Sequence, residues 1–153
     1  MALDREPIAS ALFARLQIAT GVITAGRKLI SWDALSTEAQ PALYLIQSNQ
    51  TPEQTRGLPT RWKLNFTAYL YCRNESKDEA PSIQLNRMIR AIEAALELQP
   101  NEVALPDPSN MGIHTTLGGL CSHVWISGTI ETDEGALGDQ AVAIIPIEAL
   151  STI

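Results

Sequence analysis

The chain has 153 residues and a formal net charge of −6, from 17 acidic and 11 basic residues. Its sequence pI is near 4.8, and it lacks the basic stripe of a nucleic-acid reader, so stable binding of DNA or RNA is not expected. Hydrophobic residues at 45% and charged residues at 18% are typical of one globular domain, here residues 1–153, that needs no metal or disulfide to fold.

Targeting signals are not expected in this sequence. Asp4 and Glu6 stand where a secretory signal would carry cations. No apolar run is as long as a membrane span, so the sequence predicts a cytoplasmic protein without a membrane partner. Cys72 and Cys121 are expected to be reduced and buried as small hydrophobic residues.

The first predicted element is a helix. Ile8, Leu12 and Leu16 recur every four residues and form one apolar stripe. Asp4 is a suitable N-cap, and Gly21 is expected to end the helix.

Three extended segments follow the first helix. Residues 22–32 read as a short edge strand or extended lead-in, and Pro41 starts a strand. Residues 49–60 contain two prolines and a glycine, which predict a protruding loop. The clearest strand is residues 62–72, because its residues alternate strictly. Its apolar face carries Leu64, Phe66, Ala68, Leu70 and Cys72, and its outer face carries Tyr69 and Tyr71.

A second amphipathic helix begins at Pro81, because its apolar residues recur at helical spacing. These residues are Leu85, Met88, Ile89, Ile92 and Leu96. Residues 99–112 contain three prolines and are predicted to form a loop.

The terminal stretch, Leu117 to Ile147, reads as a β-hairpin. Its first arm alternates, with Leu120, Val124, Ile126 and Ile130 on the dry face. Residues 132–139 form a polar, acidic turn in this reading. The second arm starts at Gln140, and residues 141–145 are apolar on both faces. We therefore expect one face of that arm to lie on the core and the other to contact another subunit.

The predicted order is α-β-β-β-α-β-β. It indicates an α+β fold, in which two helices pack on one face of an antiparallel or mixed sheet of four to five strands.

No catalytic or metal-binding motif stands out. His114, Cys121 and His123 are close in sequence but lack the ligand spacings of known zinc modules, so packing is the expected role. Gly118 and Gly119 precede a strand and not a helix, unlike a phosphate loop. No glycine-flanked nucleophile is present. We expect no cofactor, no metal and no enzymatic activity.

Three blocks of the sequence resemble, in order and spacing, the tail terminator (tail completion) proteins of long-tailed bacteriophages and prophages. The blocks are GRKLISWDALSTEAQPALYLI, QLNRMIRAIEAAL and TLGGLCSHVWISGTIETDEGALGDQAVAIIPIEAL. The last block is the strongest, because a Leu-Gly-Gly entry, a Trp-bearing strand, an acidic turn and a Gly-Asp-Gln-Ala strand start occur together. None of these features is a catalytic signature.

The resemblance implies a structural virion protein, made in the host cytoplasm and placed in the virion tail. Such a protein forms a homohexameric ring that caps the head-proximal end of the tail tube, stops its polymerisation and presents a docking surface to the head connector. Its partners would be itself, the tail tube protein and the head connector protein, and DNA would pass through the ring. A closed ring needs head-to-tail contacts between unlike surfaces.

Two groups of residues are candidates for these contacts. The candidates for subunit contact are Tyr69, Tyr71, Ala141, Ala143, Ile145, Arg56 and Leu58. The acidic candidates for a surface that faces the lumen or the tube are Glu131, Asp133, Glu134 and Asp139. Negative charge there would keep passing DNA from binding.

Two alternative functions stay open at this point. A head–tail joining (neck) protein would share the same acidic, non-enzymatic profile, and electron microscopy of ring symmetry and position would distinguish it. An unrelated small α+β binding module or enzyme would be revealed by a ligand-dependent shift in melting temperature.

Overall fold

Six strands form one mixed sheet in the computed structural model, which describes residues 2–74, 78–102 and 112–151. The strands are β1 (Thr24–Gly26), β2 (Ala42–Glu53), β3 (Arg61–Arg73), β4 (His123–Ile126), β5 (Glu131–Leu137) and β6 (Gln140–Ser151). Their spatial order is β1-β2-β3-β6-β4, and β5 also pairs with β6. β1 runs parallel to β2, and the other pairs are antiparallel. The predicted α+β class is confirmed, with a sixth strand added.

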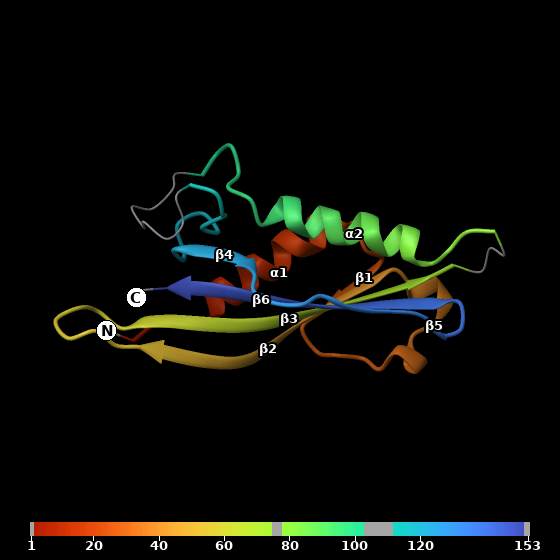
Figure 1. Cartoon of the computed structure of the whole chain (residues 1–153), viewed down its shortest axis with the longest axis horizontal. Coiled ribbons are helices and arrows are strands. Elements are labelled where there is room, and N and C mark those ends of the chain that lie inside the picture. Colours follow the sequence, from red (N-terminus) through yellow and green to blue (C-terminus); the bar gives the residue numbers. More distant parts are fainter. Residues whose placement is uncertain (1, 75–77, 103–111, 152–153) are drawn as a thin grey trace.

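Both helices lie on the same face of this sheet, as predicted (Figure 1). Helix α1 (Glu6–Thr20) buries Ile8, Leu12 and Leu16, and it ends at Gly21, whose φ of 61° lies in the left-handed region. The predicted cap is wrong, because Arg5 occupies the N-cap position and no side chain caps the helix. Helix α2 (Ser82–Ala95) buries the predicted stripe, including Leu85, Met88 and Ile92.

The main core fills the space between the helices and the sheet. Every member of the predicted apolar face of β3 is buried in it: Leu64, Phe66, Ala68, Leu70 and Cys72. Alternate residues of β6 complete this layer, among them Ala141, Ala143 and Ile145. At about 1.5–3 kcal/mol for each large side chain buried, this layer dominates stability.

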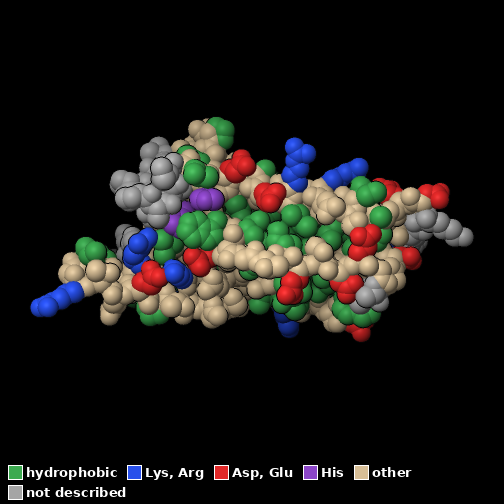
Figure 2. Space-filling view, in the orientation of Figure 1, with side chains coloured by type: hydrophobic (Ala, Val, Ile, Leu, Met, Phe, Trp, Pro, Cys, Tyr) green, Lys and Arg blue, Asp and Glu red, His purple; other side chains and the backbone are tan. Residues whose placement is uncertain are grey.

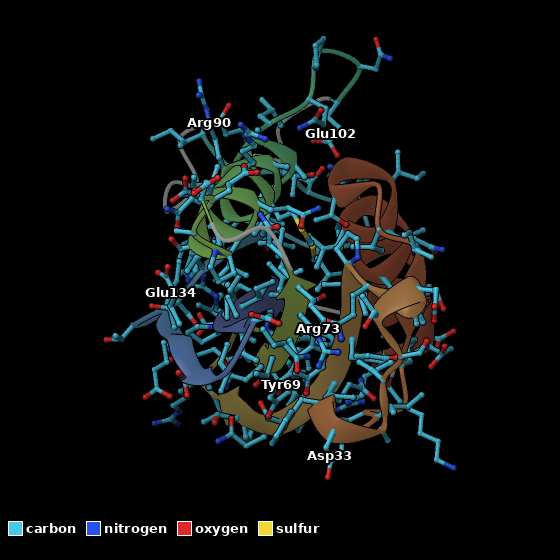
Figure 3. The ribbon with its side chains drawn as sticks, turned by 90° about the vertical axis from the view of Figure 1, so that its right-hand side faces the viewer. Asp33, Tyr69, Arg73, Arg90, Glu102 and Glu134 are labelled. Atoms are coloured by element: carbon cyan, nitrogen blue, oxygen red, sulfur yellow. The ribbon has the colours of Figure 1, made fainter. Side chains whose placement is uncertain are left out.

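Part of the opposite face of the sheet is covered by residues 31–40 of the same chain. This segment contains the 3-10 helices η1 (Trp32–Ala34) and η2 (Thr37–Ala39). A second apolar cluster lies beneath it, formed by Leu35, Ala42, Tyr44, Tyr71 and Val142. Figure 3 shows Tyr69 and Asp33 on this side, away from the helices. Residues 31–40 thus cover Val142 of β6, whereas Ile144 on the same face is only partly buried, and contact of this face with another subunit stays a prediction.

Polar contacts hold residues 31–40 against the sheet. Arg73 of β3 donates a hydrogen bond of 3.0 Å to Thr37 Oγ1. The buried side-chain amide of Gln140 donates to Gln40 Oε1 at 3.2 Å. Because both contacts join the segment to neighbouring strands, it forms part of the fold.

The terminal hairpin exists, but its first arm is divided into β4 and β5. Ser127 N donates to Pro146 O at 3.0 Å, so the backbone nitrogen of Pro146 also faces this arm. Because that nitrogen carries no hydrogen, it cannot donate the next hydrogen bond of the ladder. Pairing resumes at Glu131, opposite Ile144. Val124 is buried and Ile126 and Ile130 pack on the core as predicted, whereas Leu120 precedes the strand and is exposed.

The acidic segment is mostly strand and not turn. β5 includes Glu131, Asp133 and Glu134, and pairing continues to Leu137 opposite Gln140. The predicted turn over residues 132–139 is wrong, because the chain reverses only at Gly138 and Asp139. β5 therefore extends to Leu137 and β6 to Ser151, beyond the ends that the sequence pattern suggested.

The predicted loop 49–60 is shorter than expected, because β2 continues to Glu53 and β3 starts at Arg61. Residues 50–64, called the arm below, form a hairpin whose tip projects beyond the end of β6 (Figure 1). Most of the predicted loop 99–112 lies outside the described residues.

Candidate assembly surfaces

The tip of the arm is an ordered turn. Leu58 N donates to Thr55 O at 3.0 Å, and Gly57 has a φ of 84°, a positive value that type II turns require at their third residue. The turn presents Arg56 and Leu58 to solvent, and Leu58 is 66% exposed. An apolar side chain is thus displayed at the farthest point of the hairpin.

The arm is braced along its length. Lys63 Nζ lies 2.6 Å from Glu53 Oε1 on the facing strand, and nearer the tip Gln54 Nε2 donates to Thr60 Oγ1 at 3.2 Å. At the base, the guanidinium of Arg5 lies 4.6 Å from the ring centre of Trp62 and donates to Gln50. The arm is therefore held in one orientation relative to the body.

A groove opens between the end of α2 and strand β4. It has a volume of about 370 Å³ and is lined by Glu93, Leu96, Glu97, Ile113, His114, Trp125 and Ile126. Figure 2 shows an apolar strip beside the histidines on this face, with acidic side chains along its upper border. We call it the α2–β4 groove.

Backbone hydrogen bonds set the width of this groove. Leu98 N donates to Ile113 O at 2.9 Å, and Thr115 N donates to Leu96 O at 2.9 Å. The side chain of Ile113 is 59% exposed at the rim. The segment before β4 is thus fastened to the end of α2.

Stacked rings form the inner wall of the groove. His123 is buried and lies parallel to Trp125, with ring centres 3.9 Å apart and an interplanar angle of 21°. His114 meets the same indole edge-on at 5.4 Å. Among the described residues, no three His, Cys, Asp or Glu side chains form a group that could hold a metal. Both histidines thus contact the indole of Trp125 in this wall.

The rim of the groove is acidic. Glu93 and Glu97 are exposed, and within residues 2–74, 78–102 and 112–151 neither carboxylate forms an ion pair. They lie at the C-terminal end of α2, whose last turn has no basic residue. The helix dipole disfavours negative charge there and favours a cation.

Below the rim, Glu102 fastens the same region to α1. Its carboxylate accepts hydrogen bonds from Arg15 at 2.9 Å, from Thr115 Oγ1 at 2.7 Å and from Gly118 N at 3.1 Å. Gln99 N donates as well, at 3.0 Å. Burial by itself raises the pKa of the Glu102 carboxyl, but these donors outweigh it and lower the pKa to about 2. The site is therefore a fixed anion that organises the segment before β4.

A second hollow runs between the helices. It has a volume of about 530 Å³, and small side chains line it together with Arg15, Ile18 and Gln99. Ile18 is 82% exposed beside it. Other exposed apolar side chains lie near β1, namely Ile23, Leu29, Ile30 and Trp32.

The acidic candidates are all exposed. Glu131, Asp133, Glu134 and Asp139 are open to solvent, and Figure 3 shows Glu134 directed outward from the edge of the sheet. Glu131 and Asp133 pair opposite Ile144 and Val142, so they point to the side away from the helices. β5 thus presents negative charge on both sides of an open sheet edge.

The contact candidates fall into two groups. Arg56 and Leu58 are exposed, and Tyr69 is half-buried. The others are buried inside one protomer: Tyr71, Ala141, Ala143 and Ile145. These four are corrected as contact residues, because the helices and residues 31–40 already cover them.

Both cysteines are buried and unpaired, as predicted. Burial raises the pKa of Cys72 and of Cys121 to about 12. Within the described residues, no helix has the length and apolar character to cross a membrane.

Comparison with known proteins identifies no family. No protein-family model matches the chain, and no curated protein matches it. Among solved structures, a chain from the "virion of native gene transfer agent (GTA) particle" is similar with a TM-score of 0.49 and 8% identity, over 94% of this chain and 92% of that chain. This similarity is too low to transfer a role.

The sequence did not reveal the α2–β4 groove. Its walls come from three separate segments, and Ile113 lies at the end of a proline-rich stretch that gave no periodic signal. The signal available was the acidic pair Glu93 and Glu97, which lies outside the apolar stripe of the predicted helix.

Proposed function

We propose that this chain is a structural virion protein, a tail terminator that forms a homohexameric ring on the head-proximal end of a phage tail tube. In this role it ends tube polymerisation and offers a docking surface to the head connector. The proposal assigns it no enzymatic activity and no cofactor.

The observation that carries this proposal is the pair of unlike surfaces on one protomer. A braced arm projects from the body with Leu58 at its tip, and an apolar groove opens elsewhere, between α2 and β4. A ring requires two different surfaces that bind head to tail. The three sequence blocks that resemble tail terminators support the same function.

The charge of the molecule fits this role. The exposed acids Glu131, Asp133, Glu134 and Asp139 would face the lumen or the tube, where negative charge repels passing DNA. The proposed partners are therefore other copies of this chain, the tail tube protein and the head connector protein.

The direct test is assembly without the protein. Deleting its gene in the phage or prophage that encodes it should give tubes of irregular length and heads without tails, seen by electron microscopy. Supplying the chain in trans should restore joined particles. Tails of normal length joined to heads in the deletion strain would contradict the function, and tubes of normal length that fail to join heads would indicate the neck protein instead.

A further inference from the structure

We propose that the arm tip of one protomer binds the α2–β4 groove of its neighbour, with Leu58 in the apolar part of the groove and Arg56 between Glu93 and Glu97. This inference rests on the proposed function, since it names the contact that would close the ring.

Charge complementarity is the first argument. Arg56 is the single charged residue of the loop over residues 54–60, and it is exposed at the tip. The rim of the groove carries Glu93 and Glu97 without a partner among the described residues. An arginine placed between the two carboxylates would relieve the repulsion between them. Its positive charge would also interact favourably with the C-terminal end of the α2 dipole.

Apolar complementarity is the second argument. Leu58 is 66% exposed at the tip, and Ile113 is 59% exposed at the groove. The groove has a volume of about 370 Å³, with Leu96, Trp125 and Ile126 in its lining. A leucine side chain that enters it would be removed from water on most sides, as hot-spot residues are at interfaces.

Preorganisation is the third argument. The tip is an ordered turn with Gly57 at positive φ, and Arg5 contacts both strands at the base of the arm. The groove is equally fixed, because Leu98 and Thr115 hold its two walls together through the backbone. Little conformational entropy remains to be lost when the two surfaces meet.

Cross-linking tests the contact directly. The variant combines the substitutions Leu58→Cys and Ile113→Cys in one chain. The purified variant is treated with a short bis-maleimide cross-linker. The native thiols are silent controls, because burial raises the pKa of Cys72 and Cys121 to about 12. The expected product is a ladder of covalent species that ends at six chains, since the contact is head to tail.

The matched control is a second double variant, which combines Leu58→Cys with Ile18→Cys. Ile18 is also exposed and lies beside the other hollow of the helical face, so chance collisions would label it equally. Cross-linking through Ile18 in place of Ile113 would overturn the inference. A product that stops at two chains would also overturn it, because it indicates a two-fold contact.

Charge exchange is the second test. Arg56→Glu should weaken association about tenfold, as loss of an anchor at an interface does. Adding Glu93→Arg and Glu97→Arg to the same chain should restore most of the loss. All substituted residues are exposed, so the variants should fold, and melting temperatures close to that of the wild type would verify this.

The two proposals fail in different ways. Rings that persist in the Arg56→Glu and Leu58→Asp variants would contradict the proposed arm contact. They would not contradict the terminator function. Loss of association in Arg56→Glu without recovery in the triple variant would count against the groove as its binding site.

Discussion

Glu102 shows how much one side chain can organise in this fold. Its carboxylate joins α1, the end of α2 and the segment before β4 through Arg15, Gln99 and Thr115, while its side chain is only 6% exposed. The sequence placed it in a proline-rich loop. Nothing in its neighbours along the chain signals these contacts, because Arg15 lies 87 residues away.

We predict that Glu102→Gln lowers the free energy of unfolding by about 3 kcal/mol near neutral pH. The pKa of Glu102 falls from 4.5 to about 2 on folding, and each pKa unit corresponds to about 1.4 kcal/mol. Because the folded-state pKa is depressed, the stabilisation is complete above 4.5 and is lost as the pH falls toward 2.

Chemical denaturation at several pH values would measure this difference. The gap between wild type and Glu102→Gln should close as the pH drops from 4.5 toward 2. The control is Glu6→Gln, which removes an exposed ion pair with Arg27 and should have little effect. A gap that stays constant with pH would contradict the assigned role of the Glu102 charge.

At the scale of elements, local patterns and distant packing differ in how far they can be predicted. The apolar face of β3 and the apolar stripe of α2 follow from the spacing of apolar residues along the chain. Both were therefore predicted residue by residue. Residues 31–40 contribute only Leu35 as a buried residue of the second cluster, and one apolar residue has no period. Their role in covering Val142 of β6 was therefore missed. Ala141 and Ile145 lie on the helix side of β6, and they were mistaken for contact residues because the strand is apolar on both faces.

We predict that Tyr71→Ala destabilises the protomer by about 3 kcal/mol, because Tyr71 is buried under residues 31–40 and meets Tyr44 edge-on at 6.0 Å. Thermal or chemical denaturation would measure the loss. Tyr69→Ala is the matched control and should cost less, since Tyr69 is half-buried. Unchanged stability combined with lost self-association would instead return Tyr71 to the subunit interface.

β5 gives a second prediction at this scale, because it is an open edge protected by charge. Replacing Glu131, Asp133 and Glu134 by threonine should promote edge-to-edge pairing and concentration-dependent aggregation. Light scattering would follow it. A variant with Asp4, Asp33 and Glu38 replaced by threonine loses the same charge outside the strands. Equal aggregation of both variants would assign the effect to net charge and not to the edge.

At the scale of the whole molecule, one face of the sheet carries two helices and the other carries residues 31–40. The cover by residues 31–40 is partial, because Thr67, Tyr69 and Ile144 on that face stay half-buried. Surfaces available for assembly include the projecting arm, the α2–β4 groove, the hollow between the helices and the acidic edge. The ring account therefore places subunit contacts at the ends and rims of the protomer, where Leu58 and Ile113 are exposed.

Counting subunits tests this account most directly. Native mass spectrometry of the purified chain over a wide range of concentration, with electron microscopy of the same sample, would give both stoichiometry and symmetry. The account predicts closed rings of six 16.6-kDa chains, which disappear in the Leu58→Asp variant. Monomers at every concentration, two-fold dimers or open filaments would contradict it.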